Sequence, residues 1–137
     1  MSDMHLRTLT YTSRAVPGLT EAGLDAIHAA AKTLNALDGV TGLLIYNGTA
    51  FLQTIEGAED AIADLVARLR ADPRHHDFTI RDERTIQARS FPDWNMALAT
   101  VPAEASAARR VLERRLPDSA AGPTRALMLD MVQALDA

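Results

Sequence analysis

Apolar and polar residues alternate in the first part of the chain, between His5 and Ser13. A period of two places successive side chains on opposite faces of a β-strand. Leu9, Tyr11 and Ser13 therefore share one face, and three threonines lie on the other. This segment predicts a strand in which Tyr11 faces the same way as Leu9.

Two later segments repeat their apolar residues every three or four positions, which is the period of an amphipathic helix. The first begins after Thr20, a residue type that caps helix N-termini, and ends near Asp38-Gly39. The second covers Ala58–Ala71 and stops at Asp72-Pro73, because the residue before a proline disfavours the helical conformation. The pattern predicts two helices that each bury one face.

Two short apolar runs, Thr41–Tyr46 and Ala50–Glu56, lie between these helices. The Asn47-Gly48 pair that joins them predicts a β-hairpin with a type I′ turn, which needs positive φ at both central residues. Two further strands are expected at Phe78–Arg89 and Met96–Val101.

The predicted order is β-α-β-β-α-β with an extra fifth strand, an α/β chain of the α+β class with a ferredoxin-like arrangement. Two helices would cover one face of its sheet and leave the other face open. After Pro102, two more helices are expected at Ala103–Leu116 and Thr124–Leu135, separated by a turn region at Pro117–Pro123. We expect this helical hairpin to cover the open face.

Composition and charge narrow the functional classes. The 137 residues are enough for one domain with a hydrophobic core. A net charge of −4 argues against binding nucleic acid through bulk electrostatics, and no apolar window approaches the roughly 18 residues of a membrane helix. The absence of cysteine excludes disulfides and thiolate chemistry, and the four histidines lack metal-ligand spacing. These features predict a cytoplasmic domain without a metal site.

Three polar side chains fall where a purely structural role is unusual. Gln53 lies between Phe51 and Ile55 in a predicted strand, so its amide should point into the core. An unpartnered buried amide costs about 1–3 kcal/mol. Tyr11 can supply a hydroxyl on the same face, and Asn35 an amide from the end of the first helix. A tyrosine and two amides around an apolar slot suit a flat heterocycle with carbonyls and ring nitrogens.

The order of several motifs resembles the BLUF family, which are blue-light sensors that use a flavin. The motifs are Tyr11-Thr-Ser13, Asn35 followed by Gly39-Val-Thr-Gly42, Phe51-Leu-Gln53 with Glu56-Gly57, Asp72-Pro-Arg74-His75, and Arg89-Ser-Phe91-Pro-Asp-Trp94-Asn-Met96. The resemblance extends over residues 5–98. It implies one flavin-binding sensor domain over residues 1–101, with residues 102–137 as a helical extension of the same compact unit.

The resemblance also implies roles for individual residues. A flavin ring would insert between the two helices, with Tyr11 as the light-driven electron and proton donor. Gln53 would bridge Tyr11 to the flavin N5/O4 edge, and Asn35 would hold the carbonyl and ring-nitrogen edge. Rearrangement of the Gln53 amide would then give a red-shifted state that reverts in the dark. The other expected flavin contacts are Ile27, Phe51, Arg68, Leu69, Arg74 and His75, with Asp72 orienting the polar ones.

The resemblance implies FAD as the cofactor, with FMN or riboflavin as alternatives. Trp94 and Met96 match the signal-output strand of the family, and we expect Met96 to lie inside, near Gln53. The chain resembles the short BLUF proteins, which are not enzymes and signal by contacting a separate downstream signalling protein. We also expect a homo-oligomer, and no direct contact with nucleic acid or membrane.

The C-terminal hairpin is the expected output surface. Its apolar stripe and its arginines would contact the partner or a second copy of the chain. Deleting residues 102–137 would then leave the photochemistry largely intact. The arginines are Arg109, Arg110, Arg114 and Arg115.

Two other classes fit part of the sequence. A hydrolase of the acylphosphatase type shares the β-α-β-β-α-β framework but needs a phosphate-cradling loop, and Ser13–Gly18 offers a single arginine and a single glycine. A non-photoactive ferredoxin-like module that binds a small ligand or dimerises would leave the combination of Tyr11, Asn35 and Gln53 to chance. Neither alternative predicts a yellow protein.

Overall fold

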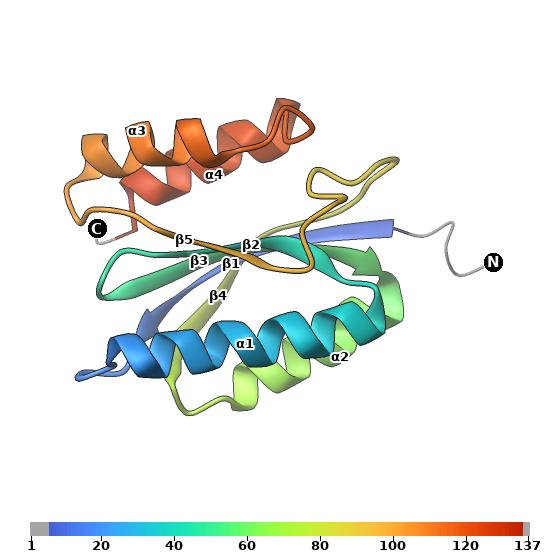
Figure 1. Cartoon of the computed structure of the whole chain (residues 1–137). Coiled ribbons are helices and arrows are strands. Elements are labelled where there is room, and N and C mark those ends of the chain that lie inside the picture. The colour runs from blue at the N-terminus through green and yellow to red at the C-terminus, as the bar shows by residue number, and fades with distance from the viewer. Residues whose placement is uncertain (1–5, 136–137) are drawn as a thin grey trace.

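The computed structural model describes residues 6–135, except for the side chain of Leu34. A five-stranded sheet in the order β4-β1-β3-β2-β5 lies between two helical layers (Figure 1). Neighbouring strands are antiparallel except β5, which runs parallel to β2. The elements are β1 (Leu6–Ala15), α1 (Glu21–Asp38), β2 (Thr41–Tyr46), β3 (Ala50–Ala58), α2 (Glu59–Ala71), β4 (His75–Thr85), β5 (Ala97–Thr100), α3 (Ala105–Arg115) and α4 (Gly122–Gln133).

Helices α1 and α2 cover one face of the sheet, and α3 and α4 cover the other (Figure 1). This arrangement confirms the ferredoxin-like α+β fold, its fifth strand and the hairpin over the open face. The caps of α1 form as predicted: the Thr20 hydroxyl accepts a hydrogen bond from the backbone of Gly23, and Gly39 adopts a left-handed conformation with φ of 69°.

The main difference in element boundaries concerns β4, which was predicted over residues 78–89 and is observed over His75–Thr85. The strand starts earlier because its pairing with β1 already begins at Ala15 and His75. It ends earlier because Arg89 turns back to the sheet, where its guanidinium donates to the Glu56 carbonyl at 3.1 Å. At the start of β1, His5 lies outside the described residues.

The hairpin between β2 and β3 forms at the predicted place with a different turn. Asn47 is not among the non-glycine residues with positive φ, so the type I′ prediction is wrong. Positive φ occurs at Gly48 instead. The Asn47 side-chain oxygen accepts hydrogen bonds from the backbone N–H groups of Thr49 and Ala50, at 3.0 and 2.8 Å. These side-chain bonds define the turn.

The sheet separates two apolar cores. The core under α1 and α2 includes Leu9, Tyr11, Leu44, Phe51, Ile55 and Met96. The core under α3 and α4 includes Leu43, Ile45, Leu52, Phe91, Leu112, Leu116, Met128, Leu129, Val132 and Leu135. Alternating residues of each strand therefore point to different helical layers, as the period of two requires.

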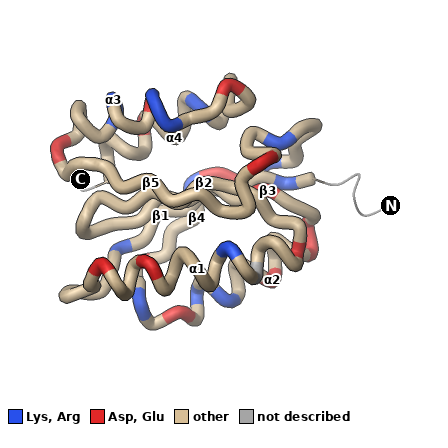
Figure 2. The backbone as a smooth tube through the Cα atoms, viewed as in Figure 1, with Lys and Arg blue, Asp and Glu red and all other residues tan. Residues whose placement is uncertain are grey.

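Most of the apolar stripe of the C-terminal hairpin is buried inside the molecule, and Leu127 and Met131 are half-buried. Leu112 and Met128 are 0% exposed, and Val132 is 3% exposed. The expectation that this stripe forms a partner surface is wrong for its buried side chains, because they cover the apolar face of the sheet. The outer surface of the hairpin is charged. Basic residues lie along α3 (Figure 2), and Arg110 and Arg114 are exposed.

A buried carboxylate holds the segment between β4 and β5 against the sheet. Glu56 is 0% exposed and accepts hydrogen bonds from the backbone N–H groups of Ser90 and Phe91, at 2.6 and 2.8 Å. The Thr41 hydroxyl also donates to it, at 3.3 Å. The two backbone donors fix the beginning of the segment that carries Trp94 and Met96, and Thr41 holds the carboxylate from β2.

The next anchor of this segment is Gly42, whose N–H donates to the carbonyl of Trp94 at 3.0 Å. Gly42 has a φ of 159°, and a Cβ on it would lie 2.0 Å from the backbone oxygen of Thr54. A side chain there is sterically excluded, so glycine allows β2 to approach β3 while binding the segment.

Candidate functional site

A cavity lies between α1 and α2, over the sheet face that carries Tyr11 and Gln53. Its inner part has a volume of about 50 Å³, and an outer groove of about 520 Å³ continues from it between the same helices. The inner part is lined by Tyr11, Ile27, Ala31, Asn35, Leu44, Phe51, Gln53, Leu65, Leu69, Asp72, Arg74 and His75. All the expected flavin contacts except Arg68 are in this set, and Arg68 lines the outer groove.

The sheet register builds the centre of the site. Tyr11 on β1 lies directly opposite Gln53 on β3. The Tyr11 hydroxyl donates to Gln53 Oε1 at 2.5 Å, and Gln53 Nε2 donates to Met96 Sδ at 3.0 Å. All three side chains are at most 3% exposed. The amide is therefore bonded at both ends, as an acceptor to Tyr11 and as a donor to Met96.

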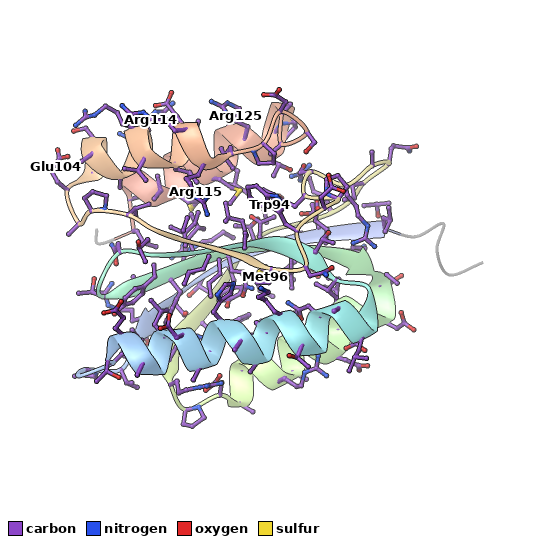
Figure 3. The ribbon with its side chains drawn as sticks, viewed as in Figure 1. Trp94, Met96, Glu104, Arg114, Arg115 and Arg125 are labelled. Carbon is purple, nitrogen blue, oxygen red and sulfur yellow. The ribbon has the colours of Figure 1, made fainter. Side chains whose placement is uncertain are left out.

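Met96 and Trp94 lie on opposite sides of the sheet (Figure 3). Trp94 stacks on Phe91 with ring centroids 5.7 Å apart and packs against the core under the C-terminal hairpin. Met96 is buried beside Gln53 in the other core. The structure thus brings Met96 to the site and leaves Trp94 outside it.

Tyr11 sits among aromatic rings in the core. It stacks on Phe78 with centroids 4.5 Å apart, and His75 approaches it edge-on at 6.2 Å. Burial raises the pKa of the Tyr11 hydroxyl well above its ordinary value, and the nearby Asp72 carboxylate raises it further. Tyr11 is therefore a neutral phenol throughout the neutral pH range.

The raised pKa predicts a loss of stability at high pH. Above about pH 10 the unfolded chain loses its Tyr11 proton while the folded chain keeps it, so the free energy of unfolding falls as pH rises. We expect Tyr11→Phe to remove this part of the slope. Urea unfolding of both proteins between about pH 8 and pH 11 measures it. Equal slopes in the two proteins would contradict the buried neutral phenol.

A polar cluster of Asp72, Arg74 and His75 lines part of the cavity. The Arg74 guanidinium donates to both carboxylate oxygens of Asp72, at 2.8–3.2 Å, and these hydrogen bonds hold the pKa of Asp72 below its ordinary value. His75 bonds the Leu69 carbonyl through Nε2 at 2.6 Å and the Ser13 hydroxyl through Nδ1 at 2.7 Å. Because a carbonyl only accepts, Nε2 carries hydrogen, which orients the ring between α2 and β1.

Asn35 is the one cavity residue whose side-chain amide lacks partners among the described residues. It is 1% exposed, and neither Oδ1 nor Nδ2 has a hydrogen-bond partner. Leaving these groups unsatisfied costs about 1–3 kcal/mol. An amide aimed into a cavity at this cost indicates a ligand with both acceptor and donor groups.

Arg68 lies at the rim of the site. Its guanidinium pairs with Asp38 at 3.3 Å, and its side chain is 43% exposed. The pair joins the end of α1 to α2, and Arg68 also lines the outer groove.

Sequence reasoning missed two residues that line the cavity and one that bonds the backbone of Met96 outside it. Leu44 lines the cavity because it lies opposite Gln53 in the β2–β3 ladder, and Leu65 because it precedes Leu69 by one helical turn. The hairpin register and the helical period could have indicated both. His28, whose Nε2 lies 2.8 Å from the Met96 carbonyl, had no such signal.

The described part of the chain offers neither a metal-ligand cluster nor a membrane-spanning helix. Within residues 6–135, no group of three histidine, aspartate or glutamate side chains is placed to hold a metal ion. No helix in this range is long and apolar enough to cross a membrane.

Comparison with curated proteins gives relatives over most of the chain. A family model described as BLUF, sensors of blue-light using FAD, matches residues 6–97. The photoactivated adenylate cyclase subunit beta of Euglena gracilis is 39% identical over 99 residues, which are 72% of this chain and 12% of that protein. The subunit alpha is 38% identical over 72 residues, 53% of this chain and 7% of that protein. The chain thus spans 12% or less of the length of these relatives.

Solved structures share the fold over the whole chain. BlrB, described as a BLUF protein in its dark state, matches with a TM-score of 0.74 and 34% identity over 100% of both chains. BlrP1 of Klebsiella pneumoniae, solved with FMN and cyclic diGMP, matches with a TM-score of 0.79 and 27% identity. That match covers 93% of this chain and 34% of BlrP1.

Proposed function

The chain belongs to the BLUF family of blue-light sensors, and from this premise we propose that Tyr11 and Gln53 switch it in response to light absorbed by a bound flavin. The observation that carries the proposal is the hydrogen-bonded series Tyr11–Gln53–Met96 at the base of a cavity between two helices. FAD is the proposed form. FMN and riboflavin carry the same ring system and would meet the same residues.

The residues around the cavity fit an isoalloxazine ring. Ile27, Phe51 and Leu69 give it apolar walls, and the unpartnered amide of Asn35 matches a ring edge with a carbonyl and a ring nitrogen. The inner part of the cavity is smaller than a three-ring heterocycle. The outer groove continues from it and shares Ile27, Asn35 and Arg74 with it, so a ring would extend from the inner part into the groove.

Removing the Asn35 amide should raise the stability of the flavin-free chain and lower its affinity for flavin. In Asn35→Leu, the flavin-free chain should gain about 1–3 kcal/mol of stability, because two unsatisfied polar groups leave the core. Flavin binding should weaken by about tenfold, since roughly 1.4 kcal/mol of hydrogen bonding is lost. Urea unfolding and a flavin fluorescence titration measure the two effects.

The matched control for Asn35→Leu is Thr33→Leu, on an exposed position of the same helix. It should change flavin affinity little. A flavin affinity unchanged in Asn35→Leu would show that the amide does not face the flavin.

In the proposed mechanism, a bound oxidised flavin would supply absorption of blue light and, in its excited state, an acceptor for an electron and a proton. Tyr11 supplies both. Its hydroxyl donates a hydrogen bond to Gln53 Oε1, so the phenol proton would leave Tyr11 toward Gln53. Since burial raises the pKa of Tyr11, the phenol starts protonated, and electron loss is coupled to proton loss.

The lasting change in this mechanism is a rearrangement of the Gln53 amide. An amide offers a donor at one end and an acceptor at the other, so rotation or tautomerisation exchanges the groups that it presents to the cavity. Return of the electron and proton to Tyr11 leaves this rearrangement in place. A changed hydrogen bond to the flavin carbonyl edge would give the slight red shift that reverts in the dark.

The proposed output path runs through β5, which begins directly after Met96. Arg115 at the end of α3 donates to the Leu98 carbonyl of β5 at 2.9 Å. A shift of this strand would therefore displace the hairpin. Figure 3 shows Arg114 on the outer side of α3, away from the sheet. We propose that the exposed arginines of α3, rather than the buried apolar stripe, contact a separate signalling protein or a second copy of the chain.

The photoactivated adenylate cyclases support regulation of an effector. Their names describe a cyclase that light activates, and this chain matches 12% or less of their length. In this proposal the domain senses light and leaves catalysis to the effector. The matches favour this function over the hydrolase and over the light-insensitive ligand module.

The test is an absorption spectrum of the purified chain, reconstituted in turn with FAD, FMN and riboflavin, before and after blue light. We expect a structured flavin band that moves slightly to the red and relaxes in the dark. A chain that binds none of the three flavins would overturn the proposal. A bound flavin that only bleaches would retain the binding site and refute the Tyr11–Gln53 switch.

A further inference from the structure

Met96 adopts an unusual backbone conformation. Its φ is 154°, in a region that side-chain-bearing residues rarely occupy. Such a conformation persists only where the surroundings hold it, and it is typical of functional positions. Met96 is 2% exposed and contacts the switch residue through its sulfur. The groups that hold its backbone therefore decide whether the sulfur stays at Gln53.

The segment before Met96 is anchored to the sheet. Glu56 accepts hydrogen bonds from the backbone of Ser90 and Phe91, and Gly42 donates to the carbonyl of Trp94. These anchors end two residues before Met96 and leave its own carbonyl to another partner.

That partner is His28 on α1. Its Nε2 lies 2.8 Å from the Met96 carbonyl oxygen, at a half-buried position. A carbonyl only accepts, so Nε2 is the donor. His28 thus reaches from the helical layer to the start of β5 and fixes the Met96 backbone from the side of the cavity. The preceding residue, Ile27, lines that cavity, so one turn of α1 provides both a cavity wall and the Met96 anchor.

The place of the Met96 sulfur determines which orientation of the Gln53 amide is favoured. In the structure, Gln53 Nε2 donates to Sδ and Oε1 accepts from Tyr11. After reversal of the amide, Oε1 would face Sδ, and two acceptors would meet without a donor between them. A sulfur held at this position therefore favours return to the orientation seen here.

We propose that His28 is a positioning residue of the switch: it holds Met96 against Gln53 and thereby shortens the lifetime of the rearranged state. This inference rests on the proposed photosensor function and deepens it. His28 touches neither the cavity nor the Gln53 amide, so it acts through Met96 alone.

The first test needs no photochemistry. The purified chain, kept in the dark, is treated with hydrogen peroxide, and the oxidation of each methionine is followed by mass spectrometry. Met96 and Met128 are 2% and 0% exposed, and Met131 is half-buried. In His28→Ala, Met96 should oxidise roughly two- to tenfold faster, the equilibrium effect of one lost hydrogen bond, while Met128 stays protected.

The variant His28→Gln provides the matched control, because its amide places a donor at a similar distance from the backbone. It should restore the slow oxidation of Met96. Faster oxidation of Met128 together with Met96 in His28→Ala would indicate general loosening of the fold and count against a specific anchor. Equal Met96 rates in the wild-type chain and His28→Ala would overturn the anchor.

The second test follows dark recovery of the red-shifted band in the flavin-loaded chain. We expect His28→Ala to lengthen the lifetime roughly two- to tenfold, and His28→Gln to bring it back toward the wild-type value. A wild-type red shift with the same lifetime in His28→Ala overturns this inference alone. A wild-type chain that binds flavin and shows no red shift overturns the proposed function, and the role of His28 in it as well.

Discussion

Replacing Gln53 with leucine is expected to abolish the red-shifted state while flavin stays bound. Leucine keeps the volume of the side chain and removes the only group that bonds both Tyr11 and Met96 within the described structure. Without an amide, no exchange of donor and acceptor can follow the loss of an electron and a proton from Tyr11. The light-minus-dark absorption spectrum of the flavin-loaded variant measures the effect.

Tyr11→Phe serves as a second variant for the same claim, because it removes the donor and leaves the amide in place. It should bind flavin and lack the normal red shift too. The control is Tyr46→Phe, because the Tyr46 hydroxyl donates to the Gly48 carbonyl at the hairpin turn and not to Gln53. It shows whether the effect is specific to the hydroxyl of Tyr11. Tyr46→Phe should show the wild-type shift. An unchanged red shift in Gln53→Leu or Tyr11→Phe would contradict the mechanism.

Deleting residues 102–137 is expected to leave the remaining chain without a stable native state. The deletion removes the apolar cover of the sheet, including Leu112 and Met128, and exposes Leu43, Ile45 and Leu52 to water. Burial of each large apolar side chain contributes about 1.5–3 kcal/mol, and a typical domain has a total stability of about 5–15 kcal/mol. Circular dichroism during heating should show no cooperative transition.

This prediction replaces the expectation from the sequence that the truncated chain keeps its photochemistry. A single substitution keeps the idea testable if the truncated chain cannot be purified: Leu112→Ala should cost about 2–5 kcal/mol of stability. The double variant Arg110→Ser, Arg114→Ser alters only exposed positions of the same helix and should melt like the wild type. A truncated chain that melts cooperatively near the full-length temperature would refute the covering role.

Much of the fold could be predicted because local patterns and tertiary packing agree. Periodicity, short apolar runs and turn residues together identified every strand and helix of the described region, and Thr20 and Gly39 cap α1 as their residue types favour. The start of β4 could not be predicted, since pairing with β1 sets it rather than its own polar residues. The hairpin turn depends on hydrogen bonds to the Asn47 side chain, which a dipeptide rule does not include.

The site divides in the same way. Alternation along β1 and β3 indicated that Tyr11 and Gln53 face one core, and the sheet register brings them together. His28 gave no signal, because its partner is a backbone carbonyl 68 positions away. The unsatisfied amide of Asn35 is likewise a tertiary property. The hairpin stripe was misjudged because an apolar helix face is equally suited to a partner and to the sheet of its own chain.

The most direct measurement of the central claim is a light-minus-dark infrared difference spectrum of the flavin-loaded chain in the carbonyl region. If light rearranges the Gln53 amide, a flavin carbonyl band should move to lower wavenumber as its hydrogen bond strengthens. It should return completely in the dark, and Gln53→Leu should show no such shift. A carbonyl band that stays in place while the visible band moves to the red, or the same carbonyl shift in Gln53→Leu, would contradict the account.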